Sequence, residues 1–243
     1  MWRQGSIFSH LPPCRLTKSH KHRLNRLQQK ENNLPNAILL FSLFQLIKIG
    51  LSYYRGDQIY AEAQSKIEDV KEDQIYHFEF DLNELQKVNP DIAGWIKIPD
   101  TPIDYPLLQP DNNQYYLKHT YNNVYSDFGS IFIDCYCTMD DQNTVIYGHN
   151  TRNDSMFGSL KKYKDDDYLK SHPYIYILYG NTEKQYEIID RKTVEITDPV
   201  YNTKIQDEEL KNDKFITLST CTSRTKTERF VIVAKEVQDV WSK

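Results

Sequence analysis

The chain has 243 residues, of which 39% are hydrophobic and 26% charged, and its formal net charge is −4. This size and composition predict one globular domain with an extension, and they exclude a disordered chain, a collagen-like repeat and a protein with many membrane spans. Four cysteines in this length do not form a disulfide-rich scaffold.

The charge is distributed unevenly along the chain. Residues 1–36 contain seven basic side chains and one acidic side chain, so the remaining residues carry a net charge of about −10. Binding to nucleic acid requires positive charge clustered on the folded surface, so this acidic main domain argues against a nucleic-acid partner. We interpret residues 1–36 as a basic cytoplasmic leader.

An apolar segment follows the leader, and 11 of the 15 residues from 37 to 51 are apolar. We predict that this segment, extended to residues 37–54, is a membrane anchor. In this anchor the Lys48 side chain would reach toward one membrane face, and Tyr53 and Tyr54 would lie at the interface. The preceding basic residues predict an N-terminus inside the cell and an extracellular main domain. A cleaved signal peptide and a helix lying on a soluble domain are the alternatives.

Residues 55–80 are predicted to form a helical linker that packs on the main domain, because residues 56–73 have apolar side chains at helical spacing. These side chains are Ile59, Ala63, Ile67 and Val70. A second short helix is predicted to begin at Asp81, with Asp81 as its cap and Glu84 completing a capping box, and to end at Asn89 before Pro90.

Residues 81–243 are predicted to be mainly β-structure, because short segments rich in β-branched and aromatic residues alternate with turn residues. The eight predicted strands cover residues 93–98, 103–108, 130–134, 144–147, 174–179, 185–196, 215–220 and 229–237. Short helices are expected near residues 114–119 and 155–163. Eight strands with peripheral short helices and an N-terminal helix predict a closed or nearly closed β-barrel.

The first candidate catalytic residue is Cys221, which ends an apolar predicted strand just before a polar loop. A thiol in that position is rigidly held and accessible, as a nucleophile requires. A single cysteine at a strand end more often serves only as a small buried side chain. Because a free thiol with a pKa of about 8.5 is mostly protonated at neutral pH, a nucleophilic cysteine needs a base or a cation nearby.

Two residues in similar positions meet this requirement. His149 follows a predicted strand, and Arg229 begins the strand that would return beside the Cys221 strand as a hairpin. In that hairpin Arg229 would lie across from Cys221, where its guanidinium can stabilise an oxyanion. Cysteine, histidine and arginine together form a complete acyl-transfer set, with the thiol as thiolate and the imidazole protonated. The spacing predicts the pairing of Cys221 with Arg229 but not the approach of His149.

Several segments together resemble sortases, and class B sortases most of all, over residues 81–237. These segments are TLSTC ending at Cys221, YGHN containing His149, GWIKIP at residues 94–99 and IDYP at residues 103–106. The resemblance implies Cys221 as nucleophile, His149 as general acid and base, and Arg229 as the group that stabilises the oxyanion and the substrate. It also implies the eight-stranded sortase barrel as the catalytic domain, residues 81–243.

This resemblance implies a membrane-anchored transpeptidase on the surface of a Gram-positive cell. Such an enzyme cleaves a C-terminal sorting motif of the NPxTx kind after its threonine, forms a thioacyl enzyme, and transfers the surface protein to a peptide amine of lipid II or the cell wall. Some class B members use a pilin lysine as the amine instead. No metal or organic cofactor is implied.

Further residues are expected to line the substrate groove. Tyr147, Ser219 and Thr220 lie within the matched motifs. Four other residues resemble positions of the groove wall, although packing or turn structure explains each of them equally well. They are Asn113, Leu117, Thr197 and Tyr201.

One departure from class B concerns residues 202–213, which are too few for the long helix that class B sortases carry over the groove. They have room for one or two helical turns near residues 208–211. This departure leaves the sequence of the sorting motif open, and one interpretation is a class-B-like variant with a more open groove.

Other interpretations remain. A thiol peptidase would form the same acyl enzyme and resolve it with water. A surface-binding module without catalytic activity is a second alternative, but the presence of Cys221, His149 and Arg229 argues against it. Cys135 and Cys137, predicted to share one strand face, lack the further ligands that a metal site with His149 would need. We expect them to be packing residues or a redox-sensitive pair.

Overall fold

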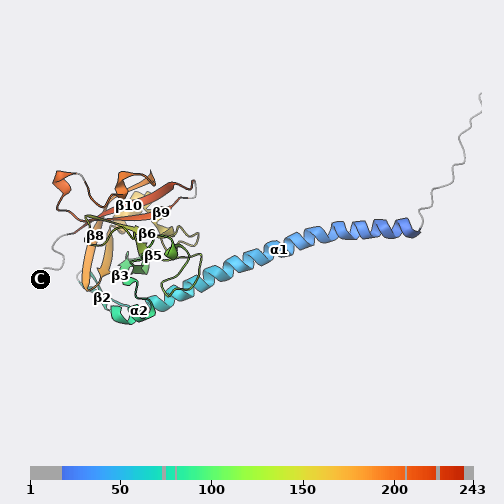
Figure 1. The fold of residues 1–243 in the computed structure, drawn as a ribbon, viewed down its shortest axis with the longest axis horizontal. Helices are drawn as coiled ribbons and strands as arrows, with labels where there is room; N and C mark the ends of the chain where they lie inside the picture. Colours follow the sequence, from blue (N-terminus) through green and yellow to red (C-terminus); the bar gives the residue numbers. More distant parts are fainter. Residues whose placement is uncertain (1–17, 73–74, 80, 206, 223–224, 238–243) are drawn as a thin grey trace, which may run out of the picture. The chain divides into compact units, whose positions relative to one another are not determined.

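The catalytic region expected from the sequence forms a closed barrel of eight strands in the computed structural model (Figure 1). The structure describes residues 18–72, 75–79, 81–205, 207–222 and 225–237. Around the barrel the strands follow the order β10-β8-β7-β3-β4-β5-β6-β9, and β9 pairs with β10 to close it. The predicted eight-stranded barrel is thereby confirmed.

Each predicted strand overlaps an observed one. The barrel strands are β3 (Ile92–Lys97), β4 (Asp104–Leu108), β5 (Ile131–Ile133), β6 (Asn143–Tyr147), β7 (Tyr174–Tyr179), β8 (Thr182–Glu195), β9 (Phe215–Cys221) and β10 (Glu228–Glu236). Most pairs are antiparallel, but β4 pairs with β5 and β6 pairs with β9 in parallel. The parallel β6–β9 pair matters for function because both strands end on the same side of the barrel.

Short helices lie between the strands. They are α2 (Leu82–Val88), η1 (Tyr115–Leu117), η2 (Gly158–Lys164), α3 (Asp166–Ser171), η3 (Pro199–Tyr201) and η4 (Glu208–Leu210). Asp81 caps α2 as predicted, but its side chain accepts from the backbone N–H of Asn83, while the Glu84 carboxylate pairs with Lys87 instead of completing a capping box. Asn89 ends α2, as predicted.

The predicted helical linker is only partly correct. Helix α1 covers Lys18–Gln64, and β1 (Glu68–Glu72) pairs antiparallel with β2 (Ile75–Glu79) in place of a longer helix. Phe78 is buried in the core, and its backbone N–H donates to the Glu183 carboxylate of β8 over 2.8 Å. These tertiary contacts favour an extended conformation over the helix that the apolar spacing predicted. Val70, the last residue of that predicted apolar helix face, lies in β1.

The chain divides into two compact units, with the boundary between Leu51 and Ser52. In the first unit the apolar side chains of residues 38–51 are exposed. Among the described residues, one helical stretch, Pro35–Gln64, is long and apolar enough to cross a membrane.

The last turns of α1 belong to the second unit and pack against the barrel. Tyr60 and Ala63 are buried there, and Ile59 is half-buried, as expected for a packing helix. Tyr53 was predicted to be an interfacial aromatic residue, but its ring packs edge-on against Phe128 at a centroid distance of 5.3 Å. Tyr54, by contrast, is 64% exposed.

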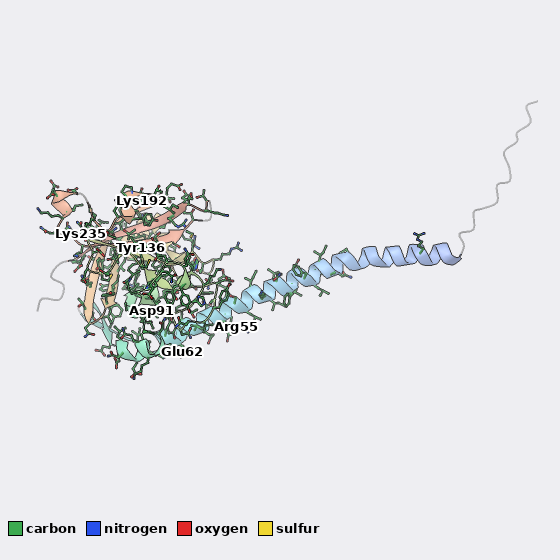
Figure 2. All side chains as sticks on the ribbon, viewed as in Figure 1. Arg55, Glu62, Asp91, Tyr136, Lys192 and Lys235 are labelled. Carbon is green, nitrogen blue, oxygen red and sulfur yellow. The ribbon has the colours of Figure 1, made fainter. Side chains whose placement is uncertain are left out.

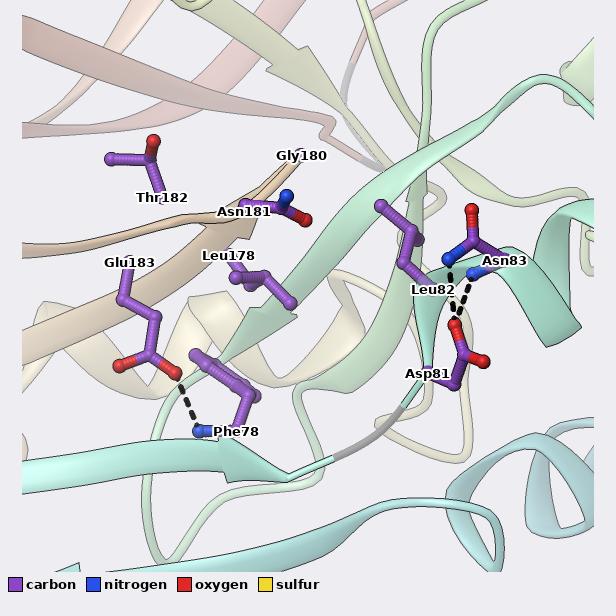
Figure 3. A pocket seen from close by; sticks show the side chains of 9 residues that line it. All are labelled: Phe78, Asp81, Leu82, Asn83, Leu178, Gly180, Asn181, Thr182 and Glu183. Atoms are coloured by element: carbon purple, nitrogen blue, oxygen red, sulfur yellow. Dashed lines mark hydrogen bonds between the residues drawn. The ribbon is translucent and has the colours of Figure 1, made fainter.

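A cavity of about 520 Å³ lies between the β2–α2 segment and the β7–β8 turn (Figure 3). Phe78 and Leu82 line it from the first segment, and Gly180 and Glu183 line it from the second. None of the predicted catalytic residues lines this cavity.

Candidate active site

Cys221 is the exposed end of an otherwise buried strand. The six preceding residues of β9 are buried because this strand is packed within the barrel wall, and the thiol emerges where the strand meets its loop. The backbone of Cys221 is fixed by its strand pairing while its sulfur remains accessible. This is the environment that a nucleophilic thiol requires.

Arg229 lies directly across from Cys221 in the β9–β10 hairpin, as the sequence predicted. Paired residues of an antiparallel ladder project their side chains from the same face of the sheet. The guanidinium is half-buried, and its Nη1 donates to the backbone carbonyls of Lys226 at 2.8 Å and Glu228 at 3.0 Å. These two bonds fix the side chain beside the thiol strand.

The parallel pairing of β6 with β9 accounts for the approach of His149. Tyr147 is the register partner of Ser219. His149 lies two residues after Tyr147, just beyond the end of β6, and Cys221 lies two residues after Ser219 at the end of β9. Two side-chain bonds hold the strand ends together beyond this ladder: Thr220 Oγ1 donates to the Gly148 carbonyl, and Asn150 Nδ2 donates to the Cys221 carbonyl, each over 2.8 Å.

The imidazole of His149 is half-buried, and its Nε2 lies 2.7 Å from the Leu117 carbonyl oxygen. A carbonyl oxygen only accepts hydrogen bonds, so Nε2 carries a proton and donates it. This contact selects the tautomer and leaves Nδ1 as the nitrogen that can exchange a proton with a thiol or an amine.

A cavity of about 300 Å³ lies at this end of the barrel. It is lined by nine of the ten predicted site residues: Asn113, Leu117, Tyr147, His149, Tyr201, Ser219, Thr220, Cys221 and Arg229. Thr197, the tenth, is exposed and is not among the lining residues, whereas its neighbour Ile196 is. Both residues lie in the turn that follows β8, where no strand periodicity indicates which side chain faces the cavity.

A polar network around Asp134 joins two residues that line the cavity, Tyr147 and Asn113. The carboxylate accepts from the Tyr147 hydroxyl at 2.8 Å and from Asn113 Nδ2 at 3.0 Å. Burial, together with this adjacent carboxylate, raises the pKa of Tyr147 above its usual range. Tyr147 therefore remains a protonated donor at neutral pH.

Tyr201 also lines the cavity, and its hydroxyl lies 2.9 Å from Ser219 Oγ. Burial raises the pKa of Tyr201, and the Ser219 hydrogen bond and the Arg229 charge oppose that effect. Tyr201 thus lies within the electrostatic reach of Arg229.

Phe132, Asp134 and Ile196 contribute to the site but were not predicted. Phe132 is the register partner of Tyr147, and their ring centroids are 5.6 Å apart. The pairing of β5 with β6, which places Phe132 across from Tyr147, is the signal that identifies Phe132. Asp134 carries no such signal, because its role depends on Asn113 coming close from a distant loop.

The described residues of the 202–213 segment, 202–205 and 207–213, are not among those that line the cavity. Gln142, which precedes β6, donates from its side chain to the Leu210 carbonyl and accepts from the Ile205 N–H. These contacts hold the single turn η4 near the start of β6 and β9, at the opposite end of both strands from Tyr147 and Cys221. The predicted short helical turn is therefore present, away from the substrate cavity.

Cys135 and Cys137 lie in the turn after β5, not on one face of a strand as the sequence suggested. Cys137 is buried, its sulfur accepts from the Val145 N–H at 3.4 Å, and burial raises the pKa of this thiol to about 11. The intervening Tyr136, which is labelled on the barrel in Figure 2, has 87% of its surface exposed according to its solvent accessibility. In the described parts of the chain, no three potential metal ligands of the His, Cys, Asp and Glu type lie together.

Comparisons with known proteins give a consistent result. A family model described as the sortase domain matches residues 96–237. Sortase B of Listeria monocytogenes is 40% identical over 182 residues, which cover 65% of this chain and 74% of the relative. Sortase B of Staphylococcus aureus is 28% identical over 205 residues, which cover 74% and 84% of the two chains.

Solved structures resemble the fold to a similar extent. The crystal structure of Clostridium perfringens sortase B matches with a TM-score of 0.60 at 31% identity, and the match covers 65% of this chain and all of the other. The Staphylococcus aureus sortase B–substrate complex matches with a TM-score of 0.65 at 25% identity, over 77% and 98% of the two chains.

Proposed function

This chain belongs to the sortase family and is a cysteine transpeptidase of the class B type, and on this premise we propose its substrates and the roles of its residues. The enzyme cleaves a C-terminal sorting motif of the NPxTx kind after threonine and transfers the surface protein to a peptide amine of the cell wall. The observation that carries this proposal is the register of β6, β9 and β10, in which His149, Cys221 and Arg229 adjoin one cavity.

In the acylation step, the Cys221 thiolate attacks the carbonyl carbon of the threonine and forms a C–S bond. The carbonyl oxygen becomes an oxyanion, which the Arg229 guanidinium stabilises. When the C–N bond breaks, protonated His149 gives its proton to the leaving amine. The products are a thioacyl enzyme and the free C-terminal fragment.

In the second step an incoming amine attacks the thioacyl carbon, and His149 accepts the proton that the amine loses. The C–S bond then breaks, and the Cys221 thiolate is restored. Arg229 can serve both steps without leaving its position, because Nη1 is bound to the Lys226 and Glu228 carbonyls while a guanidinium has further donors on Nη2 and Nε.

The groove is proposed to be more open than in other class B enzymes. Ile196 and Tyr201 form its wall on the side where residues 202–213 turn away toward Gln142. A motif that differs from NPxTx in its outer positions would be compatible with such a groove, while the threonine next to the thiol would be retained.

We further propose that residues 37–52 anchor the enzyme in the membrane, with the basic leader inside and the barrel outside. The exposed apolar helix and the seven basic residues before it support this orientation. Because Tyr53 packs on Phe128, the proposed anchor ends two residues earlier than the sequence suggested.

The experiment that tests the function is mass spectrometry of the full chain in detergent, incubated with a panel of sorting peptides in the presence or absence of glycine and lysine amines. A peptide adduct on Cys221 that is released as an amine-joined product is the expected result. Cys221→Ala should abolish the adduct, and Cys135→Ala, at the half-buried thiol in the turn after β5, should retain it. If the Cys221 adduct is released only by water in the presence of every amine tested, including a pilin-type lysine peptide, the result would favour a thiol peptidase.

A further inference from the structure

The end of α1 lies against the loop that carries Phe128 and Gly129. The Tyr53 ring packs edge-on against Phe128, and a Cβ atom added at Gly56 would lie 2.6 Å from the same ring. Glycine at position 56 therefore allows the helix to approach this loop closely. Tyr53, Gly56 and Tyr60 are three or four residues apart and lie on one face of the helix.

Tyr60 connects this helix face to the backbone beside His149. Its buried hydroxyl donates to the Gly129 carbonyl at 2.5 Å and lies 3.1 Å from Ser130 Oγ. Burial raises the pKa of Tyr60 well above its usual range, so the hydroxyl remains a donor. Ser130 Oγ in turn donates to the His119 carbonyl at 2.8 Å.

Gly129 lies directly against the imidazole. Its φ is +59°, and a Cβ atom there would lie 2.8 Å from His149 Cδ2 and 2.5 Å from the Tyr116 carbonyl oxygen. The ring atom Cδ2 is bonded to Nε2, the nitrogen that donates to the Leu117 carbonyl. A displacement of Gly129 would therefore change both the packing of the imidazole and the direction of its N–H.

A second connection from the same helix leads to the loop that follows His149. The Asp57 carboxylate accepts from Asn153 Nδ2 at 3.3 Å and from Ser155 Oγ at 3.2 Å. This loop returns to the histidine, because the Phe157 N–H donates to the His149 carbonyl at 3.0 Å. The helix end thus contacts the segments on both sides of the imidazole.

We propose that Tyr60 and Asp57 are positioning residues for His149, so that the helix that enters the catalytic unit sets the orientation of the imidazole at the active site. Tyr60 acts through Gly129, and Asp57 acts through the loop of residues 150–157. Neither residue lines the cavity that contains Cys221. This inference rests on the proposed role of His149 as the proton-transfer residue.

The test compares Tyr60→Phe with Tyr54→Phe in the full chain in detergent. Tyr54 lies on the same helix and is 64% exposed, so its variant is a matched control. Loss of the Tyr60 hydroxyl should lower kcat by about tenfold with KM unchanged, because a small misplacement of a proton-transfer group slows the chemical step without altering peptide binding. Tyr54→Phe should leave both constants unchanged.

A second readout does not depend on turnover. In protein with isotope-labelled histidine, the NMR signals of His149, assigned with His149→Ala, should shift in Tyr60→Phe and remain in place in Tyr54→Phe. If the wild-type chain processes no sorting peptide but these signals shift, the proposed function fails, while Tyr60 still sets the orientation of the His149 imidazole. Unchanged His149 signals, or a higher KM with unchanged kcat, would overturn the positioning proposal.

The exposed residue Asp57 provides a variant that leaves the core intact. Asp57→Ala should lower kcat by about threefold at constant KM, a smaller effect than that of Tyr60→Phe, because its bonds of 3.2–3.3 Å are long and exposed. The exposed neighbour Gln58 is the matched control as Gln58→Ala. Equal activity of the two variants would remove Asp57 from the proposal.

Discussion

Replacement of Arg229 by lysine tests the proposed oxyanion site directly. Arg229 is held beside Cys221 by cross-strand pairing, and its Nη1 donates to two backbone carbonyls. These contacts fix the orientation of the planar guanidinium. A lysine keeps the charge but offers one ammonium on a flexible stem, so it cannot bind these carbonyls and a substrate oxyanion with the same geometry. Loss of one preorganised oxyanion donor costs about 2.7–4 kcal/mol in transition-state stabilisation.

The expected result for Arg229→Lys is thus a fall in kcat/KM of about 10²–10³-fold. The assay is cleavage of the sorting peptide identified by mass spectrometry, followed by separation of the fragments. Arg191→Lys is the matched control, because Arg191 pairs with Asp166 on the β8–β10 side of the barrel and lies outside the cavity lining. Its effect should stay within about threefold, since surface ion pairs contribute little. An Arg229→Lys enzyme with turnover close to wild type and an unchanged melting temperature would refute the role of Arg229.

Three further predictions concern stability and the link between strands. Gly94→Ala should lower the free energy of unfolding by about 3 kcal/mol in urea titrations, because the added Cβ would lie 1.8 Å from the Leu178 carbonyl oxygen and the backbone must move. Burial raises the pKa of Tyr105 from 10.0 to about 12, so the protonated form stabilises the folded state. That contribution, about 3 kcal/mol, should be complete below pH 10 and lost as the pH rises to 12, and Tyr105→Phe should lose less stability over this range in urea titrations at each pH. Thr220→Val removes the bond to the Gly148 carbonyl and should cost about 1–3 kcal/mol of stability and also lower kcat, measured by unfolding and peptide cleavage.

Specific outcomes would contradict these three predictions. A Gly94→Ala protein as stable as the wild type would show that β3 and β7 separate at little cost, although the added Cβ would meet the Leu178 carbonyl. Equal losses of stability between pH 10 and 12 in the wild-type and Tyr105→Phe proteins would assign the alkaline transition to other groups. Full activity of Thr220→Val would show that the β6–β9 ladder and the Asn150 bond align the two strand ends without Thr220.

The barrel could be predicted from the sequence because its strands carry a strong local signal. Segments such as Tyr174–Tyr179 and Phe215–Cys221 combine β-branched and aromatic residues with clear turn boundaries, and their observed limits lie close to the expected ones. The hairpin that pairs Arg229 with Cys221 was also predictable, since a short polar loop joins two consecutive strands.

Other features depend on contacts between distant parts of the chain. The approach of His149 to the thiol depends on the parallel pairing of β6 with β9, whose first paired residues, Asn143 and Phe215, are far apart in sequence. The β1–β2 hairpin was missed because residues 59–70 have helical periodicity, and the burial of Phe78 is a tertiary effect. Helix α3 was missed although Asp165 caps it with two hydrogen bonds, because six residues give too short a periodic pattern.

The closed barrel also restricts how a peptide substrate can be recognised. Every barrel strand already has a hydrogen-bonded neighbour on each side, so a peptide cannot extend the sheet without displacing a strand. The backbone of the sorting peptide must therefore find its partners among the segments around the cavity, such as those carrying Leu117 and Ile196. Changes in these segments would alter which proteins are processed while the strands that hold Cys221, His149 and Arg229 stay the same. Selectivity and chemistry can thus evolve separately in this architecture.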